Sequence, residues 1–125
     1  MLSFSDISDH DMTSAVRAPS LIHLHILLAL ADGDLHGYGI KQEVERHTEG
    51  GVRLGPGTLY EALQRLERTG LITEVDAPEQ DDERPRRFYR LTKLGWSVMR
   101  DEVDRLQRLL DHAQTKPRLR KTGSA

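Results

Sequence analysis

Residues 56–75 carry the sequence PGTLYEALQRLERTGLITEV, and this stretch decides the fold of the 125-residue chain. Pro56 suits the first turn of a helix, and apolar residues then recur at spacings of three and four, which predicts an amphipathic helix. Gly70 ends that helix, and the alternation from Leu71 to Val75 is typical of a strand. A helix of about residues 56–69 therefore leads directly into a strand.

The helix predicted over residues 56–69 has two unlike faces. Its apolar face is expected in the core and consists of Leu59, Ala62, Leu63 and Leu66. The opposite face consists of Gly57, Glu61, Gln64, Arg65 and Arg68. A helix fits the major groove of DNA, where glutamine can recognise adenine and arginine can recognise guanine. The polar face is therefore either a DNA-recognition surface or an ordinary solvated surface, and the helix alone leaves both interpretations open.

Further helices and a second strand are predicted before and after residues 56–75. The other helices are expected over about residues 20–31, 37–48 and 93–114. Residues 31–35 are expected to form a turn, and residues 88–91 alternate as the returning strand of a hairpin. Thr92 caps the last helix and Pro117 stops it. The order predicts a mainly α protein with a small β-hairpin, as in a winged helix-turn-helix followed by a C-terminal dimerisation helix.

The composition limits the class of protein. Cysteines are absent, which excludes disulfides, thiolate zinc sites and cysteine nucleophiles. The histidines have no partners at ligand spacing and no enzyme motif is found, so we expect no metal, no cofactor and no enzymatic activity. The longest apolar run, residues 21–30, is too short to cross a membrane, and no signal-peptide pattern precedes it. A cytoplasmic location is therefore expected.

Charge is unevenly distributed, although the formal net charge is only -2. Residues 76–83 are acidic, residues 84–90 (RPRRFYR) carry four arginines, and residues 116–121 (KPRLRK) carry four further basic side chains. The arginines at the edge of the hairpin loop are expected in a wing that contacts DNA, and they are Arg84, Arg86 and Arg87. Alternatively, these arginines only neutralise the acidic run. The basic tail either contacts DNA or is a flexible, solubilising segment.

Five short motifs occur in order at compatible spacing. They are HGYGI at 36–40, GTLY at 57–60, LQRLERTGLI at 63–72, Arg86-Arg87 before YRLT at 89–92, and Gly95. Over about residues 20–112, the chain resembles the PadR family of bacterial transcriptional regulators. The resemblance implies a dimer that binds an inverted-repeat operator, usually as a repressor, through the second helix, the third helix and the wing. The expected DNA contacts are Tyr38, Lys41, Thr58, Tyr60, Gln64, Arg65, Arg68, Arg84, Arg86 and Arg87.

Glu61 departs from the pattern of that family, which commonly has proline after GTLY. A carboxylate near phosphates is unfavourable unless it accepts a hydrogen bond from the amino group of cytosine or pairs with Arg65. The sequence leaves both of these arrangements open.

The last helix carries an apolar seam at spacings of three and four, and the helix at 20–31 is apolar nearly all round. Because such side chains are costly to leave in water, we expect a homodimer. The expected interface is Leu24, Leu28, Trp96, Met99, Val103, Leu106, Leu110 and Ala113. The alternative is that the seam packs only on its own subunit.

The resemblance is to short family members with a single C-terminal helix, and it implies a pocket for a flat aromatic effector between the two C-terminal helices. The candidate lining is Trp96, Met99, Val103 and Leu106. A plain dimer core is the alternative interpretation of these four residues.

The sequence thus predicts a flexible segment at 1–18, a winged helix-turn-helix at 19–92, a dimerisation helix at 93–115 and a basic flexible tail at 116–125. The predicted function is sequence-specific transcriptional regulation, as a repressor that a small aromatic effector releases. Two other functions fit the same pattern. One is a winged-helix module that binds another protein, and the other is a DNA-binding activator without a ligand response.

Overall fold

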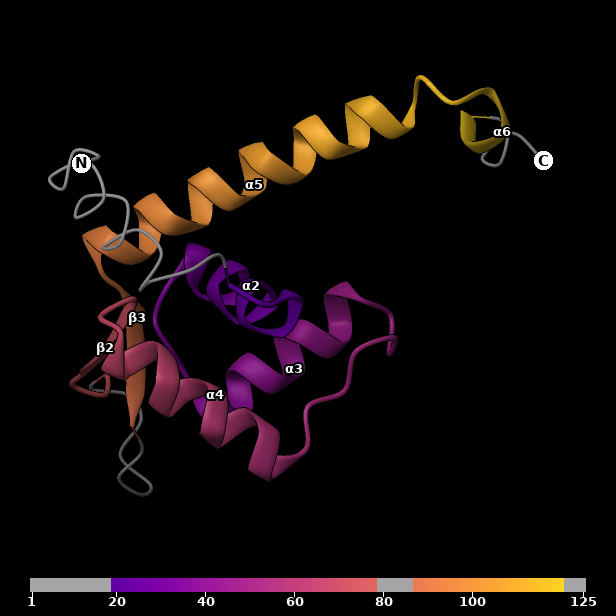
Figure 1. Cartoon of the computed structure of the whole chain (residues 1–125). Coiled ribbons are helices and arrows are strands. Elements are labelled where there is room, and N and C mark those ends of the chain that lie inside the picture. Colours follow the sequence, from indigo (N-terminus) through magenta and orange to yellow (C-terminus); the bar gives the residue numbers. More distant parts are fainter. Residues whose placement is uncertain (1–18, 79–86, 121–125) are drawn as a thin grey trace, which may run out of the picture.

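The computed structural model describes residues 19–78 and 87–120 (Figure 1). Its helices are α2 (Leu21–Ala29), the 3-10 helix η1 (Leu30–Asp32), α3 (Gly37–His47), α4 (Pro56–Arg68), α5 (Lys93–Ala113) and α6 (Pro117–Arg120). Its strands are β1 (Leu35–His36), β2 (Ile72–Val75) and β3 (Phe88–Leu91). This order confirms the predicted mainly α fold, in which α2, α3 and α4 precede the β2–β3 pair and the long helix α5 follows it.

The sheet has three antiparallel strands in the order β1-β3-β2, where the sequence predicted a two-stranded hairpin. β2 pairs with β3 as predicted, with Ile72 opposite Leu91. On the other edge of β3, β1 places Leu35 opposite Tyr89. The prediction that the turn includes Leu35 was therefore wrong, because a strand of two residues is too short to show an alternating pattern.

The segment that follows α5 also differs from the prediction. The tail expected to be flexible from Lys116 onward instead contains α6, so Pro117 begins a further helical turn. Proline fits the first position of a helix because it lacks the amide hydrogen that would be unpaired there. The predicted flexible segment at 1–18 and the end of the tail at 121–125 lie outside the described residues.

Three of the described helices, α2, α3 and α5, follow a polar side chain that accepts a hydrogen bond from the first turn. The Oγ atom of Ser20 accepts from the amide of His23 at 3.2 Å, which starts α2. The Oγ1 atom of Thr92 accepts from the amide of Gly95 at 2.9 Å, which starts α5 and confirms the predicted cap. Such caps satisfy amides that have no partner inside the helix.

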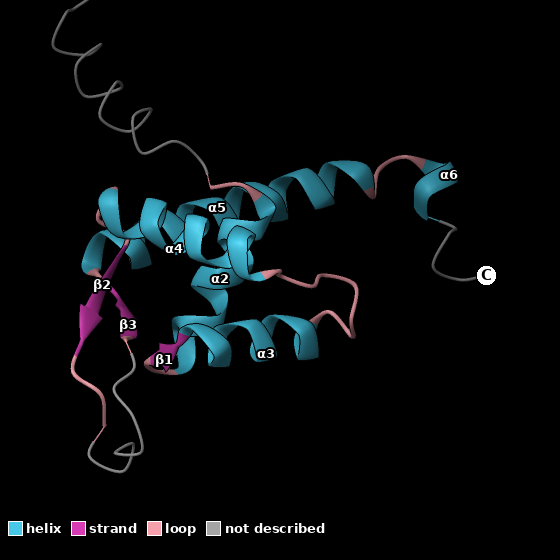
Figure 2. Cartoon of the chain, turned by 90° about the horizontal axis from the view of Figure 1, so that it is seen from below, coloured by secondary structure: helices cyan, strands magenta, loops and turns pink. Residues whose placement is uncertain are grey.

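The core lies where α2, α3 and α4 meet, and the sheet covers one edge of this cluster (Figure 2). On α2, Ile26 and Leu27 are fully buried. The apolar face predicted for α4 is buried as well, with exposed fractions from 1% to 5%. It consists of Leu59, Ala62, Leu63 and Leu66. Because this face holds α4 in the core, the opposite face of α4 is left at the surface of the molecule.

α5 begins against the body of the protein and then projects away from it (Figure 1). Its buried residues are Gly95, Met99 and Glu102, all in the first half of the helix. Glu102 accepts hydrogen bonds from Arg105 at 2.9 and 2.6 Å, which supplies the buried carboxylate with a partner. Toward the end of α5, by contrast, the apolar side chains of Leu109 and Leu110 stay at least half exposed.

Candidate nucleic-acid interface

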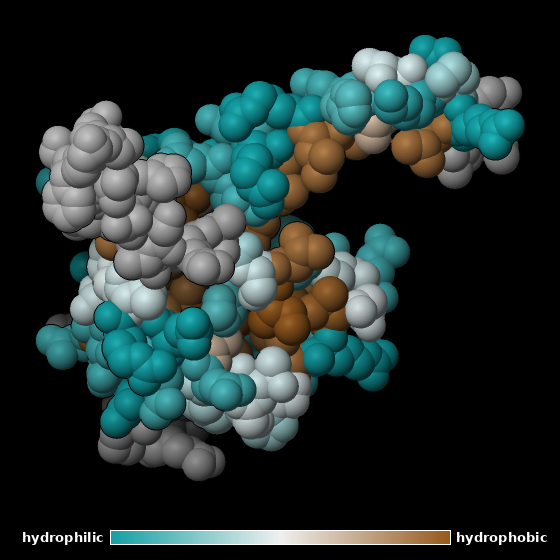
Figure 3. All heavy atoms as spheres, in the orientation of Figure 1, coloured by the Kyte–Doolittle hydropathy of each residue, from teal (hydrophilic) through white to brown (hydrophobic). Residues whose placement is uncertain are grey.

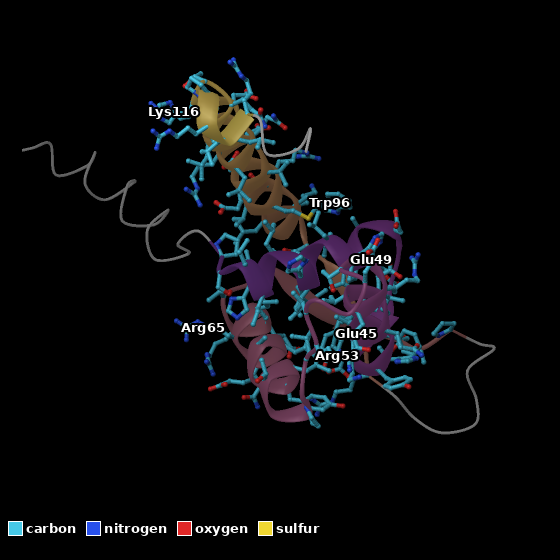
Figure 4. The ribbon with its side chains drawn as sticks, turned by 90° about the vertical axis from the view of Figure 1, so that its right-hand side faces the viewer. Glu45, Glu49, Arg53, Arg65, Trp96 and Lys116 are labelled. Carbon is cyan, nitrogen blue, oxygen red and sulfur yellow. The ribbon has the colours of Figure 1, made fainter. Side chains whose placement is uncertain are left out.

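The polar face of α4 is exposed along its whole length, as the sequence predicted. The helix begins at Pro56, and Gly55, which precedes it, supplies no capping side chain. The exposed face consists of Gly57, Glu61, Gln64, Arg65 and Arg68. Figure 4 shows Arg65 pointing outward, away from the body of the protein. The face thus presents amide, carboxylate and guanidinium groups from successive turns of one helix.

The starts of α3 and α4 lie side by side. A β-carbon at Gly37 would stand 3.6 Å from the hydroxyl oxygen of Tyr60, so that tyrosine lies against the first residue of α3. Tyr38 and Tyr60 are 58% and 57% exposed. The Nδ1 atom of His36 accepts from the amide of Gly39 at 2.9 Å and fixes the start of α3. Tyr60 of α4 thus lies beside the start of α3, where Tyr38 directly follows Gly37.

Lys41, a predicted DNA contact, is already engaged by another side chain of its own helix. Its Nζ atom lies 2.8 Å from the Oε2 atom of Glu45 in an ion pair within α3. The same ammonium lies 5.9 Å from the ring centroid of Tyr38, within the range of a cation–π contact. A contact from Lys41 to a phosphate would have to compete with the carboxylate of Glu45.

A hollow of about 320 Å³ lies between the start of α2 and the exposed face of α4. Its lining is Ser20, Ile22, His23, Thr58, Glu61, Ala62, Gln64, Arg65 and Arg68. Burial lowers the pKa of His23, and the positive charge of Arg65 lowers it further. The sequence did not indicate Ser20 and His23 at this site, because periodicity within α4 carries no information about the neighbouring helix.

Of the three arginines predicted in the wing, Arg87 is among the described residues, whereas Arg84 and Arg86 lie outside them. The guanidinium of Arg87 lies 3.9 Å from Glu74 across the β2–β3 pair. A hydrogen bond with Tyr89 and the charge of Glu74 raise the pKa of Arg87. Arg87 is therefore held beside the sheet while its side chain stays mostly exposed.

A second arginine of β3 fixes the sheet to the helical body. Arg90 donates two hydrogen bonds to the carboxylate of Asp34, at 3.0 and 2.8 Å. These bonds hold the pKa of Asp34 below its ordinary value. The sequence did not indicate this pair, since the two residues are far apart in the chain and β1 was not predicted.

Glu61 has no ion pair within residues 19–78 and 87–120. The pairing with Arg65 that the sequence left open is therefore absent from this part of the chain. Glu61 is exposed on the same face as Gln64 and Arg68.

The projecting helix α5 offers a second surface, which is apolar. Figure 3 shows apolar atoms along the underside of this helix and over the body below it. The exposed apolar side chains of α5 are Leu94, Trp96, Val103, Leu109 and Leu110, with exposed fractions from 36% to 56%. The predicted seam did not include Leu109, because its spacing admitted only one of two adjacent leucines.

Several residues predicted at the dimer interface are instead packed within the single chain. Leu24 and Met99 are only 5% and 4% exposed, so they have almost no surface left for a partner to cover. Leu106 packs partly against the same core. Of the four candidate effector residues, Trp96 and Val103 therefore offer the exposed surface. The guanidinium of Arg100 lies 5.9 Å from the ring of Trp96.

Neither a metal centre nor a membrane span is found in the described part of the chain. No group of three or more histidine, aspartate or glutamate side chains there could hold a metal ion. No helix in the same ranges has the length and apolar composition needed to span a bilayer.

A family model described as the transcriptional regulator PadR-like family matches residues 26–101, from α2 to the middle of α5. The chain belongs to the PadR-like family. It is also 41% identical over 88 residues to the transcriptional regulator Rv3488 of Mycobacterium tuberculosis, in a match that covers 70% of this chain and 78% of that protein. This PadR-like protein is accordingly a DNA-binding transcriptional regulator and not an enzyme.

Solved structures extend the likeness to the fold. A PadR family transcription regulator of Clostridium difficile is 26% identical, with a TM-score of 0.64 over 78% of this PadR-like chain and 97% of that one. PadR of Bacillus subtilis, solved in complex with operator DNA, is 23% identical, with a TM-score of 0.59 over 67% of this chain and 47% of that one. At 23% identity, the likeness to the Bacillus subtilis protein concerns the fold alone.

Proposed function

We propose that this PadR-like regulator binds an inverted-repeat operator as a homodimer and represses the adjoining gene, with α4 of each subunit in the major groove. The observation that carries the proposal is the continuous exposed polar face of α4, whose opposite face is fixed in the core. Tyr60 and the start of α3 border this face on one side, and the hollow beside Ser20 borders it on the other. Both borders offer groups that suit phosphate contacts.

The proposed dimer is supported by the apolar surface of α5. Val103, Leu109 and Leu110 are 41%, 56% and 50% exposed on a helix that projects from the body. Full burial of one such side chain contributes about 1.5–3 kcal/mol, so covering several of them favours association. A two-fold dimer would place the two α4 helices about 34 Å apart, one turn of DNA, and so match a palindromic site.

The Bacillus subtilis relative gives indirect support, because that protein was solved with operator DNA and shares the fold. Repression is the usual role that the resemblance implies. We further propose that a flat aromatic effector releases the protein from DNA. This effector would contact the exposed side chains of Trp96 and Val103.

The first experiment selects duplexes from a random DNA pool with the full-length chain and measures the affinity of the enriched sequence at several salt concentrations. We expect a palindrome bound with nanomolar affinity that falls steeply with salt. The double variant Gln64→Ala/Arg68→Ala should lose the preference for that palindrome. Arg46→Ala removes another exposed arginine, from α3, where it pairs with Glu43, and this variant should retain the preference.

If the wild type enriches no sequence, operator binding fails, and a winged-helix module that binds another protein becomes the better interpretation. Deleting the gene distinguishes the two regulatory roles, since a repressor's target rises in expression and an activator's target falls. Titration of flat aromatic compounds with Trp96 fluorescence as the readout tests the effector. No response over a broad panel would contradict the effector part alone.

A further inference from the structure

Glu61 is an unusual residue for a surface that approaches DNA. It lies in the second turn of α4, exposed, with Gln64 and Arg65 three and four residues further along the same helix. Several other acidic side chains of the described ranges are engaged by a cation, namely Asp34, Glu43, Glu45, Glu74 and Glu102. Within those ranges no cation pairs with Glu61, so its carboxylate is available to a ligand.

The chemistry of a carboxylate restricts what Glu61 can contact in the major groove. An ionised carboxylate only accepts hydrogen bonds. Guanine presents two acceptors there, thymine an acceptor and a methyl group, and adenine an acceptor beside its amino donor. Cytosine presents its amino donor alone. A carboxylate therefore meets only acceptors at guanine and thymine, an acceptor beside the donor at adenine, and a donor alone at cytosine, which is the most favourable of the four.

The phosphates add a second constraint. They repel the carboxylate at every sequence, so Glu61 weakens binding to DNA in general. Binding is restored only where a base supplies a hydrogen-bond donor to the carboxylate. This combination penalises wrong sequences more than the correct one, which is a source of specificity.

We propose that Glu61 is a specificity-determining residue that accepts a hydrogen bond from the amino group of one cytosine in each operator half-site. The inference rests on the proposed operator binding and names part of the sequence recognised. Because a helix rises about 1.5 Å per residue, Glu61 and Arg68 lie roughly 10 Å apart along α4. The cytosine should therefore lie within about three base-pair steps of the base that Arg68 contacts.

The test compares the sequences that the full-length wild type, Glu61→Gln and Glu67→Gln enrich from a random duplex pool. Glu67 is the matched control, since it lies on the same helix but is partly buried on the side near the wing, where its charge acts on Tyr89 and Arg87. Both variants remove one negative charge, so any general gain in phosphate affinity is common to them.

We expect the wild type and Glu67→Gln to enrich cytosine at one fixed half-site position. At that position, replacing cytosine with another base should weaken wild-type binding on the order of tenfold. Glu61→Gln should lose this discrimination and prefer adenine, because a glutamine amide pairs with both adenine groups.

If Glu61→Gln keeps the same cytosine while all three proteins still select an operator, the inference is overturned and operator binding stands. If no protein enriches any sequence, both the operator binding and the role of Glu61 are overturned.

Discussion

A β-carbon at Gly95 would overlap the carbonyl oxygen of Leu71. The first turn of α5 therefore lies directly on the turn that joins α4 to β2. Thr92 reinforces this contact, since its hydroxyl donates to the carbonyl of Gly70 at 2.6 Å and its amide donates to Leu71 at 3.1 Å. The helix proposed to form the dimer is thus fixed to the end of the helix proposed to enter the groove.

Gly95→Ala should destabilise the fold, because the clash involves backbone atoms that cannot move away as a flexible side chain could. We expect the free energy of unfolding to fall by at least about 2 kcal/mol in urea titrations. Gly57→Ala is the matched control in the first turn of α4, where nothing lies within 4 Å of an added β-carbon. It should be neutral or should stabilise by up to about 1 kcal/mol. Equal stability of the two variants would contradict the close approach.

Leu110→Glu should convert the proposed dimer to a monomer. Leu110 is 50% exposed in the single chain, so the folded subunit tolerates the change, whereas an interface would have to bury an unpaired carboxylate. Light scattering should give the mass of one chain, and circular dichroism should keep its helical signal. Arg108→Glu places a carboxylate at an exposed site in the same turn and should remain dimeric. A dimer of unchanged stability in Leu110→Glu would contradict the assigned surface.

The double variant Arg86→Ala/Arg87→Ala should weaken binding to all DNA sequences alike. If both arginines bind phosphates, the slope of log affinity against log salt concentration should decrease by about 0.9 for each phosphate that is no longer neutralised. Gln64→Ala should leave the slope unchanged and alter the sequence preference instead. A double variant with the wild-type slope would mean that Arg87 serves only its contacts with Glu74 and Tyr89.

The two faces of α4 could be predicted from sequence because four buried residues recur with helical spacing over one short element. Helical spacing could not distinguish the apolar residues of α5 that enter the core from those that stay exposed. Met99 and Leu110 share one helical pattern, yet Met99 enters the core of its own subunit and Leu110 lies beyond it. Spacing shows that a side chain belongs to an apolar face, but where the body ends along that face depends on the tertiary packing.

Contacts between distant segments were the other part that sequence could not supply. β1 has only two residues, so neither its pairing with β3 nor the Asp34–Arg90 ion pair left a periodic signal. The hollow beside Ser20 and His23 depends in the same way on how α2 crosses α4. These features depend on contacts between segments that are distant in the sequence, which periodicity within one segment does not report.

His23 should make the stability of the fold depend on pH. Its folded-state pKa is lowered from 6.5, first by burial and then by Arg65, while Glu61 and Arg68 also face the same hollow. The unfolded chain therefore takes up the proton first as the pH falls below about 6.5. The free energy of unfolding should be highest above that pH and should decrease toward the folded pKa, with no further loss from this group below it. Urea titrations between pH 7.5 and 5, at about half-unit steps, measure this slope.

His23→Gln should flatten that part of the pH profile, because glutamine does not titrate. Arg65→Gln should give an intermediate slope, since it removes the charge that lowers the pKa of His23 but leaves the larger effect of burial. Parallel profiles for the wild type and His23→Gln would show that the imidazole meets the same environment in the folded and unfolded chains. The graded response of the two variants separates the effect of burial from that of the neighbouring guanidinium, which a single variant could not do.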